Sequence, residues 1–320
     1  MKLMIWIVRW LLIICIANFA FGQEEIQVLQ GSVPPIIVKE GQTPDTDAVV
    51  IASTRNYPSV TARTLNFDTF VGYTCGANGE PCGMPVSLIE PNRYVSTWIF
   101  VHGNQIPAEE ATKRGVAVYR RLRARSVNNG PIRFVIWSWP SERNANRIVD
   151  ARRKEHRTNV ESFYLGSYIA AVAAQGPMKF VGYSFGTRIV GGGLHLSAGG
   201  SLDGHCLPNM AQPAEPHRIA FLAAAIESDG FKSGGRYSRA MDHANFLLLH
   251  NNSRDQALRF YWIINPRKPK ALGNQGMTCR PPHLTVHQYD WADSIGKDHR
   301  LWQYLDRPIV IQRVSEALGG

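Results

Sequence analysis

The sequence predicts an α/β fold, with a mostly parallel central sheet and helices on both faces. Short apolar runs rich in β-branched and aromatic residues alternate with stretches of helical periodicity through most of the 320-residue chain. Several runs are apolar at every position, which is typical of parallel strands covered on both sides. With 44% hydrophobic and 19% charged residues, the chain can build one large core.

The predicted elements follow one another in βα order. The first half of the chain contains predicted strands at 49–52, 94–101, 132–139 and 179–183, and predicted helices at 108–125 and 152–174. The second half contains a helix at 184–197, strands at 219–226, 246–250 and 284–289, and a last helix that starts near Leu301. Residues 198–216, rich in Gly and Pro, are predicted to form a loop over the functional site.

The N-terminus has the features of a cleavable export signal. Lys2 and Arg9 supply a positively charged start, an apolar run covers residues 10–21, and small residues at positions 20 and 22 offer a cleavage site. A signal anchor is the alternative, but the apolar run is shorter than the roughly 20 residues that a spanning helix needs. We therefore expect an exported protein, secreted or periplasmic.

This interpretation divides the chain into three segments. Residues 1–22 are the expected signal peptide, and residues 23–47, rich in Pro, Gly, Gln and Asp, are expected to be loosely ordered. Residues 48–320 contain no Pro/Ser-rich linker, so we expect them to form one domain.

The chain is moderately basic. Its formal charge is +10, which falls to +8 without Lys2 and Arg9. The densest basic cluster, at residues 152–157, starts a predicted helix and is typical of a solvated helix face. The sequence contains no RNP, helix-turn-helix or zinc-finger pattern, so we expect no nucleic-acid partner. The charge leaves peripheral contact with an anionic membrane open, and the oligomeric state is not predicted.

Four cysteines follow the predicted signal: Cys75, Cys82, Cys206 and Cys279. An exported protein can form disulfides, and we expect Cys75 to pair with Cys82 across a short Gly/Asn/Pro loop, which leaves Cys206 for Cys279. Another pairing, or four buried thiols, is the alternative. The sequence contains no CxxC, Cys/His cluster or HExxH pattern, so we expect neither a metal site nor a cofactor.

A GxSxG pentapeptide is the strongest motif. Gly182 and Gly186 flank Ser184, directly after a predicted strand and before a predicted apolar helix. A strand-to-helix turn tight enough to project the serine hydroxyl leaves no room for side chains two residues to either side. The motif therefore predicts that Ser184 is a nucleophile, and an ordinary Gly-rich turn is the alternative.

At these residues the sequence resembles the α/β-hydrolase superfamily. A second match is a hydrophobic strand that ends in His-Gly, at residues 100–104, and the resemblance covers most of residues 48–318. It implies an α/β-hydrolase fold and a triad of serine, acid and histidine. It also implies that backbone N–H groups of Phe185 and of the loop with Gly103 and Asn104 hold an oxyanion. A simple turn at the His-Gly pair is the alternative.

The family order places the histidine after the final strand and before the final helix, and only His299 fits well. It stands between the strand that ends near Tyr289 and the helix that starts near Leu301. His283 and His287 fall at or within that strand, where structural roles are commoner. The resemblance therefore implies that His299 is the general base.

The acid of the triad is expected at Asp255. This residue follows the predicted strand at 246–250, as the acid-bearing turn of the family does. Asp229 and Glu227 follow the preceding strand and are the alternatives, because some family members carry the acid one strand earlier. A purely structural interpretation makes Asp255 a helix N-cap.

The predicted function is that of a serine hydrolase that cleaves an ester or related acyl bond of a small molecule through an acyl-enzyme. A hydrolase-fold binding protein without turnover and an amidase or peptidase with the same triad are the alternatives. Residues 137–140, Trp-Ser-Trp-Pro, end a strand on the expected active-site side, where they either line a pocket or belong to the core. Lipase, esterase and thioesterase activities all fit the sequence.

Overall fold

The structure is a computed structural model, and it describes residues 47–57, 71–75, 81–88, 96–127, 130–143, 146–265 and 267–319. The predicted signal peptide at 1–22 lies outside the described residues, as does the predicted N-terminal segment except for Asp47. Within the described part of the chain, none of the helices has the length and hydropathy that a membrane crossing requires.

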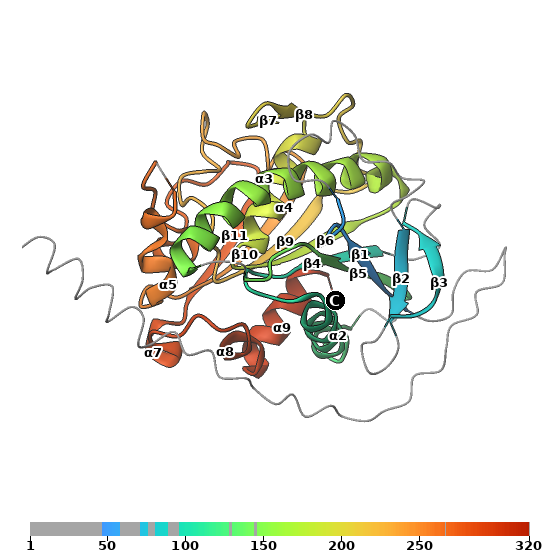
Figure 1. Ribbon diagram of the computed structural model, residues 1–320, viewed down its shortest axis with the longest axis horizontal. Coiled ribbons are helices and arrows are strands. Elements are labelled where there is room, and N and C mark those ends of the chain that lie inside the picture. Colours follow the sequence, from blue (N-terminus) through green and yellow to red (C-terminus); the bar gives the residue numbers. More distant parts are fainter. Residues whose placement is uncertain are drawn as a thin grey trace, which may run out of the picture. The chain divides into compact units, whose positions relative to one another are not determined.

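Among the described residues, nine strands form one sheet in the order β11-β10-β9-β6-β4-β5-β1-β2-β3 (Figure 1). The first seven strands in this order run parallel: β11 (Thr285–Asp290), β10 (Ala244–Asn251), β9 (His217–Leu222), β6 (Met178–Tyr183), β4 (Ser96–Val101), β5 (Ile132–Ser138) and β1 (Ala48–Ser53). The last two, β2 (Val71–Cys75) and β3 (Pro81–Ser87), extend the sheet by antiparallel pairing.

Continuous apolar sequence produces the central strands. Every residue of β4, β5 and β6 is buried, as the uniform apolar runs predict for a sheet covered on both faces. Phe100 of β4 pairs in register with Ile136 on one side and with Val181 on the other. The carboxyl ends of these parallel strands therefore lie side by side.

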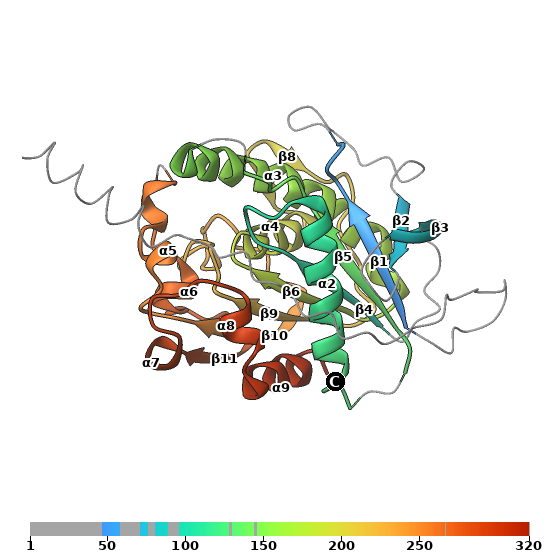
Figure 2. The same ribbon diagram turned by 60° about the horizontal axis from the view of Figure 1, so that its bottom comes forward.

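Helices cover both faces of the sheet (Figures 1 and 2). On one face, α3 (Arg147–Val172) packs against α4 (Gly186–Ser197). On the other face, α2 (Ala108–Arg123) packs against α9 (Pro308–Ala317). The prediction of an α/β fold with a mostly parallel, helix-covered sheet is confirmed.

Local signals explain where two helices begin. The side chain of Asn146 accepts hydrogen bonds from the backbone N–H groups of Ile148 and Val149, so α3 begins at Arg147 rather than at the predicted residue 152. The predicted last helix is two helices, α8 (Trp302–Leu305) and α9, because Pro308 cannot donate the hydrogen bond that a continuous helix needs.

Other boundaries differ from the prediction. Strand β9 ends at Leu222 rather than at residue 226, because Ala223 adopts a left-handed φ of 45° and the chain leaves the sheet there. The predicted loop at 198–216 contains a small hairpin of β7 (Ser201–Leu202) and β8 (His205–Cys206). Several short helices were not predicted from the sequence: α5 (Gln256–Arg259), α6 (Leu272–Gln275), α7 (Ala292–Ile295), η1 (Ala173–Gln175) and η2 (Tyr261–Ile263).

The cysteine prediction is wrong for one of its two pairs. Cys206 and Cys279 are free and exposed, so they form no disulfide. Their pairing rested on the even number of cysteines, but a disulfide needs Cα atoms within about 7 Å, which parity cannot ensure. The predicted bond between Cys75 and Cys82 lies outside the described side chains.

Candidate active site

Ser184 stands on a tight turn between β6 and α4. Its φ of 52° is left-handed, a conformation that costs free energy for a non-glycine residue and is common at functional sites. A Cβ at Gly186 would lie 2.1 Å from the carbonyl oxygen of Val101, and one at Gly182 would lie 3.0 Å from the Cα of Thr187. The two glycines of the motif therefore allow the close approach that this turn requires.

The turn is fixed by backbone hydrogen bonds to the end of β9 and to the segment that follows it. The N–H of Ser184 donates to the carbonyl of Leu222, at 3.1 Å, and its carbonyl accepts from the N–H of Ala225, at 3.2 Å. The carbonyl also accepts from the Thr187 hydroxyl, at 2.6 Å. These contacts hold the strained conformation of Ser184 in place.

The structure brings Ser184, His299 and Asp255 together in one hydrogen-bonded series. The Oγ of Ser184 lies 2.8 Å from Nε2 of His299, and Nδ1 of His299 lies 2.6 Å from Oδ2 of Asp255. The Asp255 side chain is fully buried, and that of His299 is 13% exposed. Because a carboxylate only accepts, Nδ1 carries the proton and Nε2 is free to accept one from the serine.

Asp255 has two structural partners. Its Oδ2 contacts His299, and its Oδ1 accepts a hydrogen bond from the N–H of Leu258 as the N-cap of α5. The two interpretations of Asp255 from sequence, N-cap and partner of the histidine, thus hold at the same time. The cap fixes the orientation of the carboxylate toward the imidazole.

The alternative acids lie elsewhere. Buried Glu227 accepts hydrogen bonds from Arg188, at 3.2 Å, and from Asn265, at 2.9 Å. Asp229 is exposed and forms an ion pair with Lys232. Among the described residues, the carboxylate that contacts the histidine is that of Asp255.

Two residues that sequence analysis did not identify hold the histidine loop. The hydroxyl of Tyr183 donates to the carbonyl of His299, at 2.7 Å. The side-chain amide of Asn252 donates to the carbonyls of Gly296, at 2.8 Å, and Asp298, at 3.2 Å. Tyr183 ends one predicted strand and Asn252 lies two residues beyond another, but nothing in the sequence indicates that their partners lie so far along the chain.

The environment of His299 favours its charged form. Burial lowers the pKa of the imidazole, but the charge of Asp255, the hydrogen bond with Asp255 and the charge of Asp298 outweigh burial and raise the pKa above its ordinary value. The imidazolium that forms when a base takes up a proton is therefore stabilised in this position.

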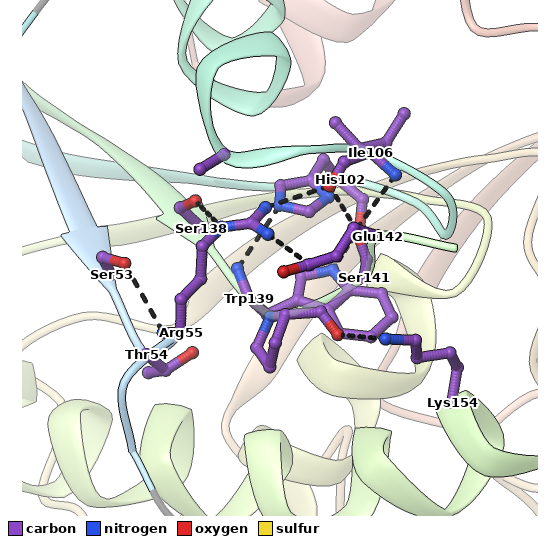
Figure 3. A network of polar contacts seen from close by, with 12 residues as sticks. Ser53, Thr54, Arg55, His102, Ile106, Ser138, Trp139, Ser141, Glu142 and Lys154 are labelled. Atoms are coloured by element: carbon purple, nitrogen blue, oxygen red, sulfur yellow. Dashed lines mark hydrogen bonds and ion pairs between the residues drawn. The ribbon is translucent and has the colours of Figure 1, made fainter. Parts of the chain in front are cut away.

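His102 has the opposite environment (Figure 3). It is fully buried, and burial lowers its pKa to about 3, so the ring is neutral. Its Nε2 accepts from the N–H of Trp139, at 3.3 Å, so the proton is on Nδ1, which donates to the carbonyl of Gly103, at 2.8 Å. The peptide bond between Gly103 and Asn104 is planar and trans, so the N–H of Asn104 points opposite to the Gly103 carbonyl. The hydrogen bond from His102 to that carbonyl therefore also fixes the direction of the Asn104 N–H.

Free backbone donors lie beside Ser184. The N–H groups of Phe185, Gly103 and Asn104 have no hydrogen-bond acceptor among the described residues. A Cβ at Gly103 would lie 3.0 Å from the Cβ of Ser184, so the loop reaches the serine directly. Unpaired N–H groups at such a position are suited to hold a negatively charged oxygen.

The remaining candidates from sequence have structural contacts. Trp137 and Trp139 are fully buried, so they belong to the core rather than to a pocket wall. His283 contacts the carbonyl of Met241, at 2.8 Å, and His287 packs edge-on against Phe246. In the described part of the chain, no group of three or more His, Cys, Asp or Glu side chains is arranged to hold a metal ion.

Comparison of the sequence with models of protein families gave no match, and comparison with curated proteins gave none either.

Proposed function

We propose that the chain is a serine hydrolase of the α/β-hydrolase fold that cleaves an ester or related acyl bond. The observation that carries this proposal is the continuous series from Asp255 through His299 to Ser184, with the serine on a strained turn. Asp255 follows β10, His299 follows β11 and Ser184 follows β6. All three therefore lie beyond the carboxyl ends of parallel strands, which is where catalytic residues of doubly wound sheets are found.

The geometry supports a two-stage mechanism. His299 takes the proton of the Ser184 hydroxyl through Nε2, and Oγ attacks the acyl carbonyl carbon. The carbonyl oxygen becomes an oxyanion held by the N–H groups of Phe185 and of the loop with Gly103 and Asn104. The imidazolium then gives its proton to the leaving group, which departs and leaves Ser184 acylated. Water, deprotonated by His299, releases the acid and restores the serine.

Asp255 has the same role in both stages of this mechanism. Its carboxylate keeps the His299 proton on Nδ1, which presents Nε2 to the serine, and its charge stabilises the imidazolium. The reaction needs no cofactor. The substrate class is an acyl ester or thioester of a small molecule, and the positive charge of the chain is compatible with a substrate presented at an anionic membrane.

The test is covalent labelling. A fluorophosphonate probe should label the wild-type protein, and mass spectrometry should place the adduct on Ser184. The Ser184→Ala variant should remain unlabelled, whereas Ser294→Ala, which removes an exposed serine whose hydroxyl contacts the carbonyl of Trp291, should label like the wild type. Equal labelling of wild type and Ser184→Ala would exclude Ser184 as the nucleophile.

A substrate panel separates the related functions. We expect hydrolysis of p-nitrophenyl acetate and p-nitrophenyl butyrate above the rate of the Ser184→Ala protein, and slower cleavage of the matching anilides. Faster cleavage of the anilides would make the protein an amidase, and no turnover of either would make it a binding protein.

We also propose that the protein acts after export, on the strength of the N-terminal signal at residues 1–22. N-terminal sequencing of protein recovered outside the cytoplasm should begin at Gln23. Recovery of the full-length chain from the cytoplasmic fraction would contradict this.

A further inference from the structure

A polar network lies next to the candidate site, at the ends of β1, β4 and β5 (Figure 3). Its centre is Arg55, which follows β1 and whose side chain is only 10% exposed. The guanidinium donates three hydrogen bonds: Nε to the hydroxyl of Ser138, at 2.9 Å, Nη1 to the carboxylate of Glu142, at 2.6 Å, and Nη2 to the carbonyl of Ile106, at 3.1 Å. One side chain thus joins three segments that are distant in sequence.

Two of these segments are also bonded to each other. We call residues 102–106 the HG loop and residues 138–142 the WP loop. The N–H of Gln105 donates to the carbonyl of Ser141, at 2.8 Å. The hydroxyl of fully buried Ser141 accepts from the N–H of Ile106, at 3.2 Å, and donates to its carbonyl, at 2.9 Å. At the other end, the indole of Trp139 donates to the carbonyl of His102, at 2.9 Å.

The HG loop is held in a strained conformation. Gln105 has a left-handed φ of 62°, although it is not a glycine. Such a conformation persists only where the surroundings impose it, and it is concentrated at functional sites. Hydrogen bonds from the WP loop hold the HG loop on both sides of Asn104, at His102 and at Gln105, and Arg55 holds the carbonyl of Ile106. The network therefore controls the part of the loop whose direction matters to an oxyanion.

We propose that Arg55 is a positioning residue for the oxyanion-binding N–H groups of the HG loop, acting through Ile106 and the WP loop. This inference rests on the proposed hydrolase function. Arg55 acts through these neighbours, since each of its three guanidinium nitrogens donates to one of them: Nε to Ser138, Nη1 to Glu142 and Nη2 to Ile106. Its planar, forked guanidinium can serve three acceptors at fixed angles, which a lysine ammonium cannot reproduce.

The proposal predicts a specific kinetic pattern. A misplaced N–H donor stabilises the transition state less but changes the binding of the substrate little, so kcat falls and KM stays nearly the same. For Arg55→Met, which keeps the apolar stem, we expect kcat for p-nitrophenyl butyrate to fall by about 10- to 100-fold with KM within about threefold of wild type. Arg55→Lys, which keeps the charge, should lose less.

A reversible transition-state analogue gives the second measurement. Oγ of Ser184 adds to the carbonyl carbon of 1,1,1-trifluorohexan-2-one, and the serine proton passes to His299. The carbonyl oxygen then becomes an oxyanion. The inhibition constant of the ketone should rise in Arg55→Met by the same factor by which kcat falls. The matched control is Arg123→Met: Arg123 pairs with Asp47 at the other end of β1, and its removal should leave kcat, KM and the inhibition constant unchanged.

The outcomes are distinct. A folded Arg55→Met protein with wild-type kcat, or one whose losses match those of Arg123→Met, would overturn the proposal. If Arg55→Met does not fold, as judged from its thermal unfolding, Arg55→Lys and Glu142→Gln are compared in the same way, and wild-type kinetics in both would overturn it. A wild-type protein that neither hydrolyses the ester nor binds the ketone would instead overturn the hydrolase function on which the inference rests.

Discussion

The surroundings of His299 and His102 shift the pKa values of the two imidazoles in opposite directions. His299 lies against the Asp255 carboxylate, and its pKa is raised although the ring is buried. His102 is buried, its ring nitrogens contact a backbone carbonyl and a backbone N–H, and its pKa falls to about 3. A group that takes up a proton needs a partner that stabilises the cation, whereas a group that orients a backbone donor needs to stay neutral. The difference assigns the two histidines to separate tasks.

The largest expected effect concerns the carboxylate beside His299. In Asp255→Asn, the new amide donates to Nδ1 and places the imidazole proton on Nε2, where it blocks acceptance of the serine proton. We expect kcat for p-nitrophenyl butyrate to fall by about 10³- to 10⁴-fold. Steady-state kinetics with active-site titration measure this directly.

Glu227→Gln is the matched control for that experiment. Glu227 is also buried and follows the neighbouring strand, but its partners are Arg188 and Asn265. We expect kcat within about threefold of wild type and a loss of about 1–3 kcal/mol in the free energy of unfolding, because a buried charged hydrogen bond is weakened. Equal losses of kcat in the two variants would contradict the assignment of Asp255.

A smaller effect is expected on the other side of the serine, at His102. Asparagine places its amide N–H where Nδ1–H of histidine lies, so His102→Asn can still donate to the Gly103 carbonyl. Glutamine places its amide near Nε2 and cannot. We expect kcat to fall by about 10- to 100-fold in His102→Gln and by less in His102→Asn, with little change in KM. Equal losses in both variants would mean that the bond to Gly103 does not orient the N–H of Asn104.

The sequence predicts the central part of this arrangement because local pattern determines it. Uniform apolar runs make β4, β5 and β6 recognisable, and the position of Ser184 between a strand and a helix follows from its glycines. The positions of His299 and Asp255 relative to the predicted elements match the order that the resemblance implies. The structure then brings both into contact with each other, and His299 with Ser184.

The rest could not be predicted because it depends on contacts between distant segments. Arg55 lies in no motif, and its partners Ser138 and Glu142 are 83 and 87 residues away in sequence. Strands β2 and β3 contain glycine and proline, which weaken a strand pattern. Cysteine parity likewise says nothing about which surface loops meet, and the Cys206–Cys279 prediction failed for that reason.

The smallest expected effect is on the pH dependence of the proposed base. His299 must be neutral to accept the serine proton, so kcat/KM should fall as the pH drops through the His299 pKa, and the raised pKa moves that midpoint up from the ordinary histidine range. Asp298 contributes to this because its negative charge favours the imidazolium. In Asp298→Asn the imidazolium loses that support, the pKa falls, and the acidic limb should move to lower pH.

The shift should be small because Asp298 is partly exposed and already paired with Arg300, so its charge is screened. At pH 5.5 we expect kcat/KM of Asp298→Asn, relative to its own plateau, to exceed that of wild type by less than about tenfold. Asp306→Asn, at an exposed ion pair with Arg121, is the control and should leave the limb in place. If the limb moved to higher pH in Asp298→Asn, the loss of a negative charge would have raised the pKa of the titrating group. That result would mean that the limb does not report the titration of His299.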